Sequence, residues 1–162
     1  MRAVVFVTDD EQAIRAAIVK RLTRQGHRAV GYESGEALLE ALRHELPDLV
    51  LLDLKMPGLN GLDTLKRLRQ LAPSAMVIML TAYGTVQDAV EAMKLGAYDF
   101  LIKSVDLEGI DPVVVRVLDV VSLRRRLESE LEHRDSQYQL SHLVAQSHAM
   151  KQLLEQVREV AE

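Results

Sequence analysis

The strongest constraint on the fold of this chain is a regular alternation between short apolar runs and longer stretches in which apolar residues recur at helical spacing. The run Ala3 to Thr8 is followed by a helical stretch from Glu11 to Gln25, and the run His27 to Tyr32 by another from Ser34 to Glu45. Three further runs continue the alternation: Asp48 to Leu52, Ala75 to Leu80 and Ala97 to Ile102. Five strand–helix units in series predict a parallel sheet covered by helices.

The composition of the runs also predicts the strand order. Strands buried on both faces are continuously apolar, which describes the first, third and fourth runs but not His27 to Tyr32 or Ala97 to Ile102. The second and fifth strands are therefore expected at the edges. With right-handed crossovers, this predicts a doubly wound α/β sheet of the flavodoxin-like order 2-1-3-4-5. Gly26, after the first helix, and Ser34, as an N-cap of the second, support these boundaries.

Beyond Ile110 the pattern changes to one long helix, which we expect to start late or to be kinked. Asp111 and Pro112 are typical of an N-cap and a first helical residue. Apolar residues then follow in steps of four and three, as in a coiled coil, along the seam Val113, Val117, Val120, Arg124, Leu127 and Leu131. We expect one domain over residues 1–121, a helical, coiled-coil linker over 122–146, and the first helix of a truncated following domain over 147–162.

Composition excludes several classes of function. The 162 residues carry a net charge of −4, 4% are aromatic and none is Trp, so the basic stripe and stacking aromatic rings of a nucleic-acid binder are lacking. There is no cysteine, which rules out disulfides, thiolate metal sites and cysteine nucleophiles. The apolar stretches fall far short of the roughly 18 residues of a membrane span. We expect a cytoplasmic protein without direct contacts to nucleic acid or membrane.

Polar residues stand where four of the five strands end. Asp9 and Asp10 follow the first strand, Asp53 the third, Thr81 the fourth and Lys103 the fifth. In doubly wound sheets ligands bind at this edge. Carboxylates that lie close together repel one another, and a basic partner or a bound divalent cation relieves the repulsion. Ligands that are all oxygen favour Mg²⁺.

A carboxylate can also act as a nucleophile toward phosphorus if cations neutralise the transferring oxygens. Lys103 supplies such a cation, and Thr81 supplies a hydroxyl that can donate to a phosphoryl oxygen. The same residues and their neighbours resemble the receiver domains of two-component response regulators, over residues 3 to about 121. The matching motifs are Asp9-Asp10, Leu51 to Gly58 around Asp53 with Gly61 following, Thr81-Ala82, and Lys103 after Tyr98-Asp99-Phe100.

The resemblance implies a role for each matching residue. Asp53 would accept a phosphoryl group from a histidine kinase, Asp9 and Asp10 would hold Mg²⁺ together with Asp53, and the backbone carbonyl of Lys55 would complete the metal site.

By the same resemblance, Thr81 and Phe100 would be the switch pair that moves inward together after phosphorylation. Homodimerisation would use the face formed by the fourth helix, the fifth strand and the last helix, together with the linker helix.

The segment Leu143 to Met150 is similar to the opening of the AAA+ ATPase domain in NtrC-type, sigma-54-dependent activators. The chain ends before any GxxxxGK phosphate loop, so we expect a phosphoacceptor and no ATPase site in this chain. Phosphorylation would change the dimer arrangement and thereby the activity of an attached ATPase.

One residue departs from the family pattern. Receiver domains usually have a proline joined by a cis bond after the lysine, whereas Ser104 stands here. A cis bond before serine costs about 2.5 to 4 kcal/mol, so we expect a trans bond with a rearranged loop or a strained cis bond. This departure keeps open an alternative function, a receiver-fold dimerisation module that does not respond to phosphate.

Two further classes of protein fit the sequence less well. A phosphatase of the haloacid-dehalogenase type has a second Asp two positions after its nucleophile and then a Thr, whereas Lys55 and Pro57 occupy these places. A flavodoxin-like carrier of FMN is disfavoured because an acid-lined edge repels a bare phosphate.

Overall fold

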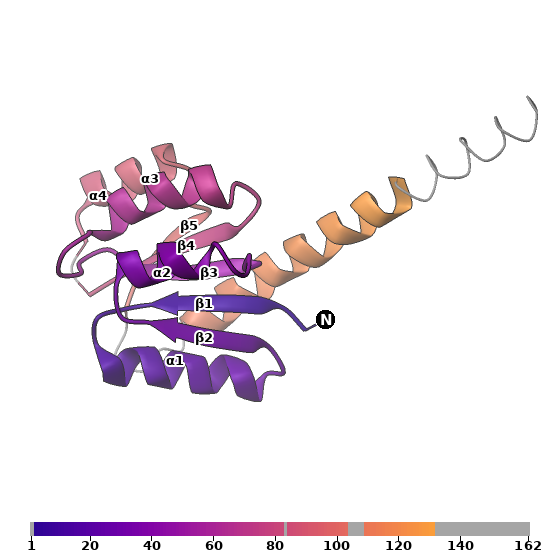
Figure 1. The fold of residues 1–162 in the computed structure, drawn as a ribbon, viewed down its shortest axis with the longest axis horizontal. Helices are drawn as coiled ribbons and strands as arrows, with labels where there is room; N and C mark the ends of the chain where they lie inside the picture. The colour runs from indigo at the N-terminus through magenta and orange to yellow at the C-terminus, as the bar shows by residue number, and fades with distance from the viewer. Residues whose placement is uncertain (1, 83, 104–108, 132–162) are drawn as a thin grey trace, which may run out of the picture. The chain divides into compact units, whose positions relative to one another are not determined.

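The computed structural model describes residues 2–82, 84–103 and 109–131. The chain divides into two compact units, Met1–Val121 and Ser122–Glu162. Residues 110–121 of the first unit and 122–131 of the second are helical. The remaining elements all belong to the first unit and are β1 (Val4–Thr8), α1 (Gln12–Arg24), β2 (Arg28–Tyr32), α2 (Gly35–Ala41), β3 (Leu49–Asp53), α3 (Gly61–Leu71), β4 (Met76–Thr81), α4 (Val86–Lys94) and β5 (Asp99–Ile102) (Figure 1).

The five strands form one parallel sheet in the order β2-β1-β3-β4-β5, which confirms the predicted doubly wound fold with β2 and β5 at its edges. The predicted and observed strand bounds agree to within two residues. Because every strand runs in the same direction, the carboxyl ends of β1, β3, β4 and β5 lie at one edge of the sheet.

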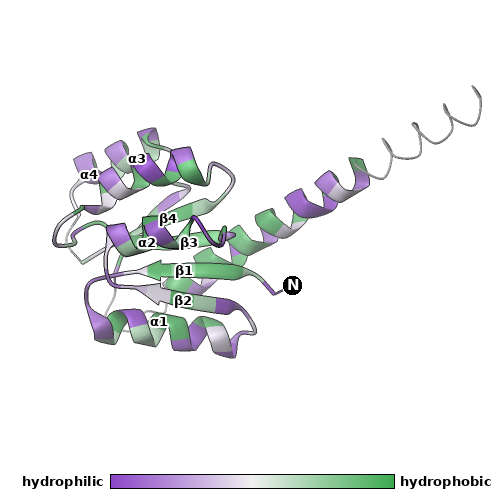
Figure 2. Ribbon diagram, in the orientation of Figure 1, coloured by the Kyte–Doolittle hydropathy of each residue, from purple (hydrophilic) through white to green (hydrophobic). Residues whose placement is uncertain are grey.

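Alternate residues of the central strands enter two apolar cores, one on each face of the sheet. The ribbon of these strands is largely in the hydrophobic colour, green, in Figure 2. On one face, Phe6, Val50, Leu52 and Met79 pack with buried residues of α2, α3 and α4. On the other face the strands pack with α1 and with helical residues near the C-terminal end of the first unit; this core includes Val5, Val7, Leu49, Leu51, Ile78, Leu80, Ile18, Leu22, Val114, Val117 and Leu118. Within the described parts of the chain, no helix has the length and apolar character to cross a bilayer.

Helix boundaries follow the local signals, with one exception. Gly26 lies just after α1 with a φ of 90°, and the Ser34 hydroxyl oxygen accepts the Ala37 N–H, both as predicted. However, α2 ends at Ala41 and a turn follows, whereas the sequence predicts a helix to Glu45. After Ala41 the Arg43 and His44 N–H groups donate to the carbonyls three residues earlier, of Glu40 and Ala41, so the helix tightens into a turn. Pro47 in addition keeps Leu46 out of the helical conformation.

The last helix of the first unit begins at residue 110, so the prediction that Asp111 is its N-cap is wrong. Asp111 lies within the first turn, and its carboxylate binds Arg21 of α1, with Nε 2.7 Å from Oδ1. Pro112 also falls in the first turn, where the missing N–H costs no helical hydrogen bond. The late start that the sequence indicated is confirmed.

The predicted coiled-coil seam is wrong at its first two positions. Val117 is completely buried in the core beside α1, and Val113 packs against the same core. Their spacing therefore reflects packing on the sheet. Val120, Leu127 and Leu131 are exposed. The Lys103–Ser104 bond, linker residues 132–146 and the predicted helix over 147–162 lie outside the described residues.

Gly61 marks the closest approach of α3 to the sheet. A Cβ atom at this position would lie 2.2 Å from the carbonyl oxygen of Asp53 and 2.7 Å from Cα of Leu54, so a side chain would force α3 away from the end of β3. We expect Gly61→Ala to lower the free energy of unfolding by about 1 to 3 kcal/mol, measured by urea denaturation. At Gly109 a Cβ atom meets no atom of the described residues within 4 Å, so Gly109→Ala is the matched control. Equal stability of the two variants would contradict this packing argument.

Candidate functional site

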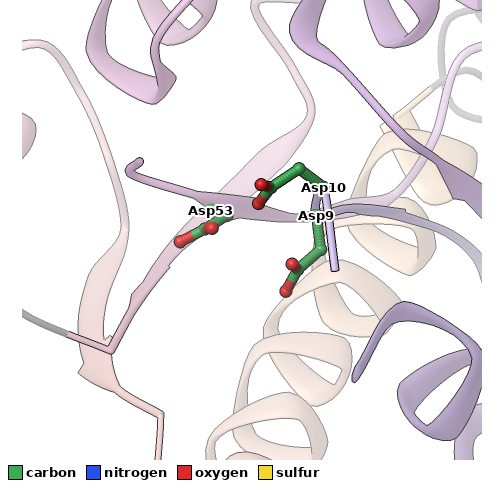
Figure 3. A group of neighbouring side chains, drawn as sticks. All are labelled: Asp9, Asp10 and Asp53. Atoms are coloured by element: carbon green, nitrogen blue, oxygen red, sulfur yellow. The ribbon is translucent and has the colours of Figure 1, made fainter. Parts of the chain in front are cut away.

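Three carboxylates meet at the carboxyl ends of β1 and β3 (Figure 3). Asp9 and Asp10 directly follow β1, and Asp53 is the last residue of β3. Each contributes one oxygen to a group in which all oxygens lie within 4.8 Å of one another. Asp9 and Asp53 are buried, whereas Asp10 is exposed. The structure therefore places side by side the three acidic residues that the sequence assigns to this edge.

The ammonium group of Lys103, just after β5, contacts two of these carboxylates. Its Nζ lies 2.8 Å from Oδ2 of Asp9 and 3.1 Å from Oδ2 of Asp53, and its side chain is only 5% exposed. Three carboxylates and one ammonium leave two uncompensated negative charges in this cluster. A divalent cation would balance that charge.

Burial raises the pKa of Asp53 above its ordinary value, and the charge of Asp9 raises it further, against the lowering effects of Lys103 and of the Lys55 N–H that donates to the carboxylate. For Lys103, burial alone would lower the pKa. The hydrogen bond to Asp9 and the charges of Asp53 and Asp9 outweigh burial, and the pKa of Lys103 is raised. Lys103 is thus held as a cation beside Asp53, and the contacts of Asp53 only partly offset the cost of burying its negative charge.

The loop between β3 and α3 is fixed by a residue that the sequence analysis did not single out. Glu36 of α2 accepts the Leu59 N–H at 3.0 Å. Its pKa is lowered by its own backbone N–H and by that of Leu59. Gly58, next to Leu59, has a φ of 76°, a conformation that glycine adopts without strain. This contact ties α2 to the loop that follows Asp53.

The two predicted switch residues converge on a glycine. Thr81 is fully buried at the end of β4, one residue beyond Leu80, which is paired with Asp53. A Cβ atom at Gly84 would lie 2.7 Å from Cγ2 of Thr81 and 2.7 Å from Cζ of Phe100. The threonine methyl and the edge of the phenylalanine ring therefore both pack against the backbone at Gly84, a contact that strand and helix patterns could not predict.

The donor set suits a hard cation. Mg²⁺ prefers oxygen ligands and is commonly held by one or two carboxylates together with water. Asp9, Asp10 and Asp53 offer carboxylate oxygens close enough to share one ion. The raised pKa of Asp53 indicates that its charged form would gain from a further cation. For Lys55 the structure describes the N–H that donates to Asp53, and the role of its carbonyl as a ligand stays a prediction.

Comparison with known proteins agrees with this geometry. The sequence model of the response regulator receiver domain matches residues 5–114. The chain is 37% identical to the DNA-binding transcriptional regulator NtrC of Escherichia coli K12 over 117 residues, which are 72% of this chain and 25% of NtrC. It is 29% identical to the regulatory protein AtoC of the same strain over 157 residues, which are 97% of this chain and 34% of AtoC. The chain thus spans about a third or less of these relatives.

Solved structures show the same fold. The crystal structure of NtrX from Brucella abortus in complex with ATP matches with a TM-score of 0.72 and 32% identity, over 79% of this chain and 29% of NtrX. The response regulator TrrA from Thermotoga maritima, in complex with Mg²⁺ and BeF, matches with a TM-score of 0.65 and 29% identity, over 72% of this chain and 99% of TrrA. With its five-stranded sheet and its acidic edge, this chain belongs to the response regulator receiver domain family.

Proposed function

We propose that this chain is the regulatory part of a cytoplasmic, NtrC-type, sigma-54-dependent activator, and that Asp53 accepts a phosphoryl group from a histidine kinase in the presence of Mg²⁺. The observation that carries the proposal is a buried carboxylate, Asp53, with the Lys103 ammonium 3.1 Å away and two further carboxylates within 4.8 Å. The relationship to NtrC and AtoC supports the regulatory role.

In the proposed metal site Asp9, Asp10 and Asp53 hold Mg²⁺, with the Lys55 carbonyl as a further ligand. The ion, when bound, neutralises charge on the phosphoryl oxygens. That TrrA is described in complex with Mg²⁺ and BeF supports a similar requirement here.

The residues of the chain carry out the transfer itself. One oxygen of the Asp53 carboxylate attacks phosphorus, and the bond from phosphorus to the donor's leaving atom breaks, so that the electron pair departs with the leaving group. Lys103 is held as a cation near the developing charge. The Thr81 hydroxyl, at the end of the neighbouring strand, donates to a phosphoryl oxygen.

The switch follows from a change in what Thr81 contacts. A phosphoryl group shifts an equilibrium only if it makes different contacts in the two states. A hydrogen bond from Thr81 to the new group supplies such a difference. Because Thr81 and the Phe100 ring both touch Gly84, movement of the threonine is coupled to the space available to the ring.

The proposed output is a rearranged homodimer, formed through α4, β5, the last helix of the first unit and the linker helix. On α4, Val86, Val90 and Met93 form an exposed apolar stripe at helical spacing, and Ile102 of β5 is 68% exposed. The helical residues of the second unit expose Leu123, Leu127 and Leu131. Such surfaces are typical of interaction sites. The dimer would in turn control an ATPase domain beyond this chain.

A dimerisation module that ignores phosphate is the second candidate, because exposed apolar surfaces of this kind are in themselves typical of interaction sites. The two candidates differ in a single measurement. The chain is incubated with acetyl phosphate in Mg²⁺ or in EDTA, and its intact mass and sedimentation are recorded. The receiver function predicts one added phosphoryl group and a changed sedimentation in the sample with Mg²⁺, and neither change in the sample with EDTA. An unchanged mass in both buffers would favour the phosphate-independent module.

A further inference from the structure

Arg15 of α1 reaches the loop that carries the acidic pair. Its Nη1 donates to the backbone carbonyl of Asp9 at 2.5 Å and lies 3.4 Å from the carbonyl of Asp10. The aliphatic part of the side chain crosses β2 at Gly31, where a Cβ atom would lie 3.0 Å from Cγ and 3.2 Å from Cδ of Arg15. A glycine within a strand often marks such a close approach. The absence of a side chain at Gly31 therefore leaves the slot through which Arg15 reaches the loop.

The other polar atoms of Asp9 are also engaged. Its N–H donates to the carbonyl of Tyr32 at 3.1 Å, Oδ1 accepts the Glu11 N–H at 3.0 Å, and Oδ2 meets the Lys103 ammonium at 2.8 Å. Arg15 completes this set at the carbonyl oxygen. The Asp10 side chain is exposed, so the direction of its carboxylate depends on how the backbone before and after it is held.

We propose that Arg15 is a positioning residue for the metal site: it fixes the carbonyls of Asp9 and Asp10 so that their carboxylates converge with Asp53 on a divalent cation. The inference rests on the proposed metal-dependent function. Arg15 contacts the backbone of the ligand residues, in the manner of outer groups that orient metal ligands in proteins. Both contacts come from Nη1, whose two N–H bonds are held in the guanidinium plane, whereas the N–H bonds of a lysine ammonium rotate freely.

Because Arg15 is positively charged, a positioning role and a purely electrostatic role predict opposite changes in Mg²⁺ affinity when it is replaced. A fixed positive charge near a cation site weakens cation binding if it acts through its field alone. Removal of the charge would then strengthen Mg²⁺ binding, and Arg15→Lys would leave it unchanged. The positioning role gives the opposite result, because both Arg15→Met and Arg15→Lys lose the guanidinium contact with the loop.

The experiment is a titration of the whole chain with Mg²⁺, followed by amide NMR shifts in the loop after β1, without any phosphodonor. We expect Arg15→Met and Arg15→Lys to weaken Mg²⁺ binding by about 10- to 100-fold. Gly31→Val keeps Arg15 but fills its slot with a residue that strands favour, and should weaken binding similarly. Lys20→Met removes an exposed positive charge from the same helix and serves as the control with parental affinity.

Urea denaturation in EDTA shows whether each variant is folded, and Gly31→Val keeps the test decisive if an Arg15 variant is unstable. Parental or tighter Mg²⁺ binding by folded Arg15→Met would overturn the positioning role while leaving the proposed phosphoacceptor function intact. Failure of the parent chain to bind Mg²⁺ at all would overturn both.

Discussion

The Asp53→Asn protein takes up no phosphoryl group from acetyl phosphate and Mg²⁺ under conditions in which the parent chain gains one. Among the three clustered carboxylates, Asp53 is the one that combines burial at the end of β3, a cation 3.1 Å away and a raised pKa. An amide of the same shape has no ionised oxygen with which to attack phosphorus. The expected effect is therefore complete loss of the covalent product.

Intact-protein mass spectrometry measures this loss directly. Asp63→Asn is the matched control, because Asp63 lies half-exposed in the first turn of α3, bonded to Asn60 and Lys66 and outside the acidic cluster. The control should be phosphorylated as fully as the parent. A phosphoryl group on the Asp53→Asn protein would show that another residue is the acceptor.

Loss of function in this variant will not come from unfolding. Burial raises the folded-state pKa of Asp53, so the folded protein binds this proton more tightly than the unfolded chain does. The free energy of unfolding therefore falls as the pH rises through the two pKa values, and at neutral pH the ionised side chain lowers stability. In metal-free buffer Asp53→Asn should be more stable than the parent at neutral pH. The difference should disappear in acid, below the titration of the carboxyl group.

Much of this fold follows from local patterns. Burial on both faces makes central strands continuously apolar, so the runs of β1, β3 and β4 reveal their place in the sheet. The acidic cluster was predictable for a related reason: parallel strands bring their carboxyl ends to one edge, and Asp9, Asp10 and Asp53 follow or end two of them.

What the sequence could not reveal is how single residues from different elements meet. Val117 has coiled-coil spacing, but it is buried on the sheet, because a helix that packs on a sheet and one that packs on a second helix share nearly the same period. Glu36 and Arg15 bond to backbone atoms of distant loops, and such contacts leave no motif. Of the residues in these contacts, Gly31 is the one that the sequence could have indicated, because a glycine inside a strand often marks the close approach of another group.

Removal of the Lys103 ammonium should lower the stability of the protein, the opposite of the effect expected for Asp53→Asn. We expect Lys103→Met to lower the free energy of unfolding at neutral pH, without Mg²⁺, by about 3 to 5 kcal/mol, the usual cost of removing one partner from a buried ion pair. The ammonium contacts both Asp9 and Asp53, so its removal leaves two buried carboxylates without it. Methionine keeps an unbranched apolar stem, so the change is mainly one of charge.

Urea denaturation with and without Mg²⁺ tests this account. Lys66→Met is the matched control, because Lys66 is an exposed partner of Asp63 and such surface pairs contribute little. The deficit of Lys103→Met should shrink with Mg²⁺, which supplies positive charge to the same carboxylates. It should also shrink in acid, because the raised pKa of Asp53 makes that carboxyl group neutral there. Equal stability of Lys103→Met and Lys66→Met would contradict the buried-charge argument.

A double variant separates the two charges. If the buried charge of Asp53 lowers the free energy of unfolding, Asp53→Asn should recover part of the stability that Lys103→Met loses. The changes in the free energy of unfolding caused by the two single substitutions should then not add up to that of the double variant. Additive effects would mean that Asp53 and Lys103 do not interact across their 3.1 Å contact. Opposite signs for the two single variants indicate that this ion pair is not optimised for stability. The cluster holds more negative charge than Lys103 balances, and a bound metal ion would neutralise that excess so that an anionic phosphoryl donor could approach Asp53.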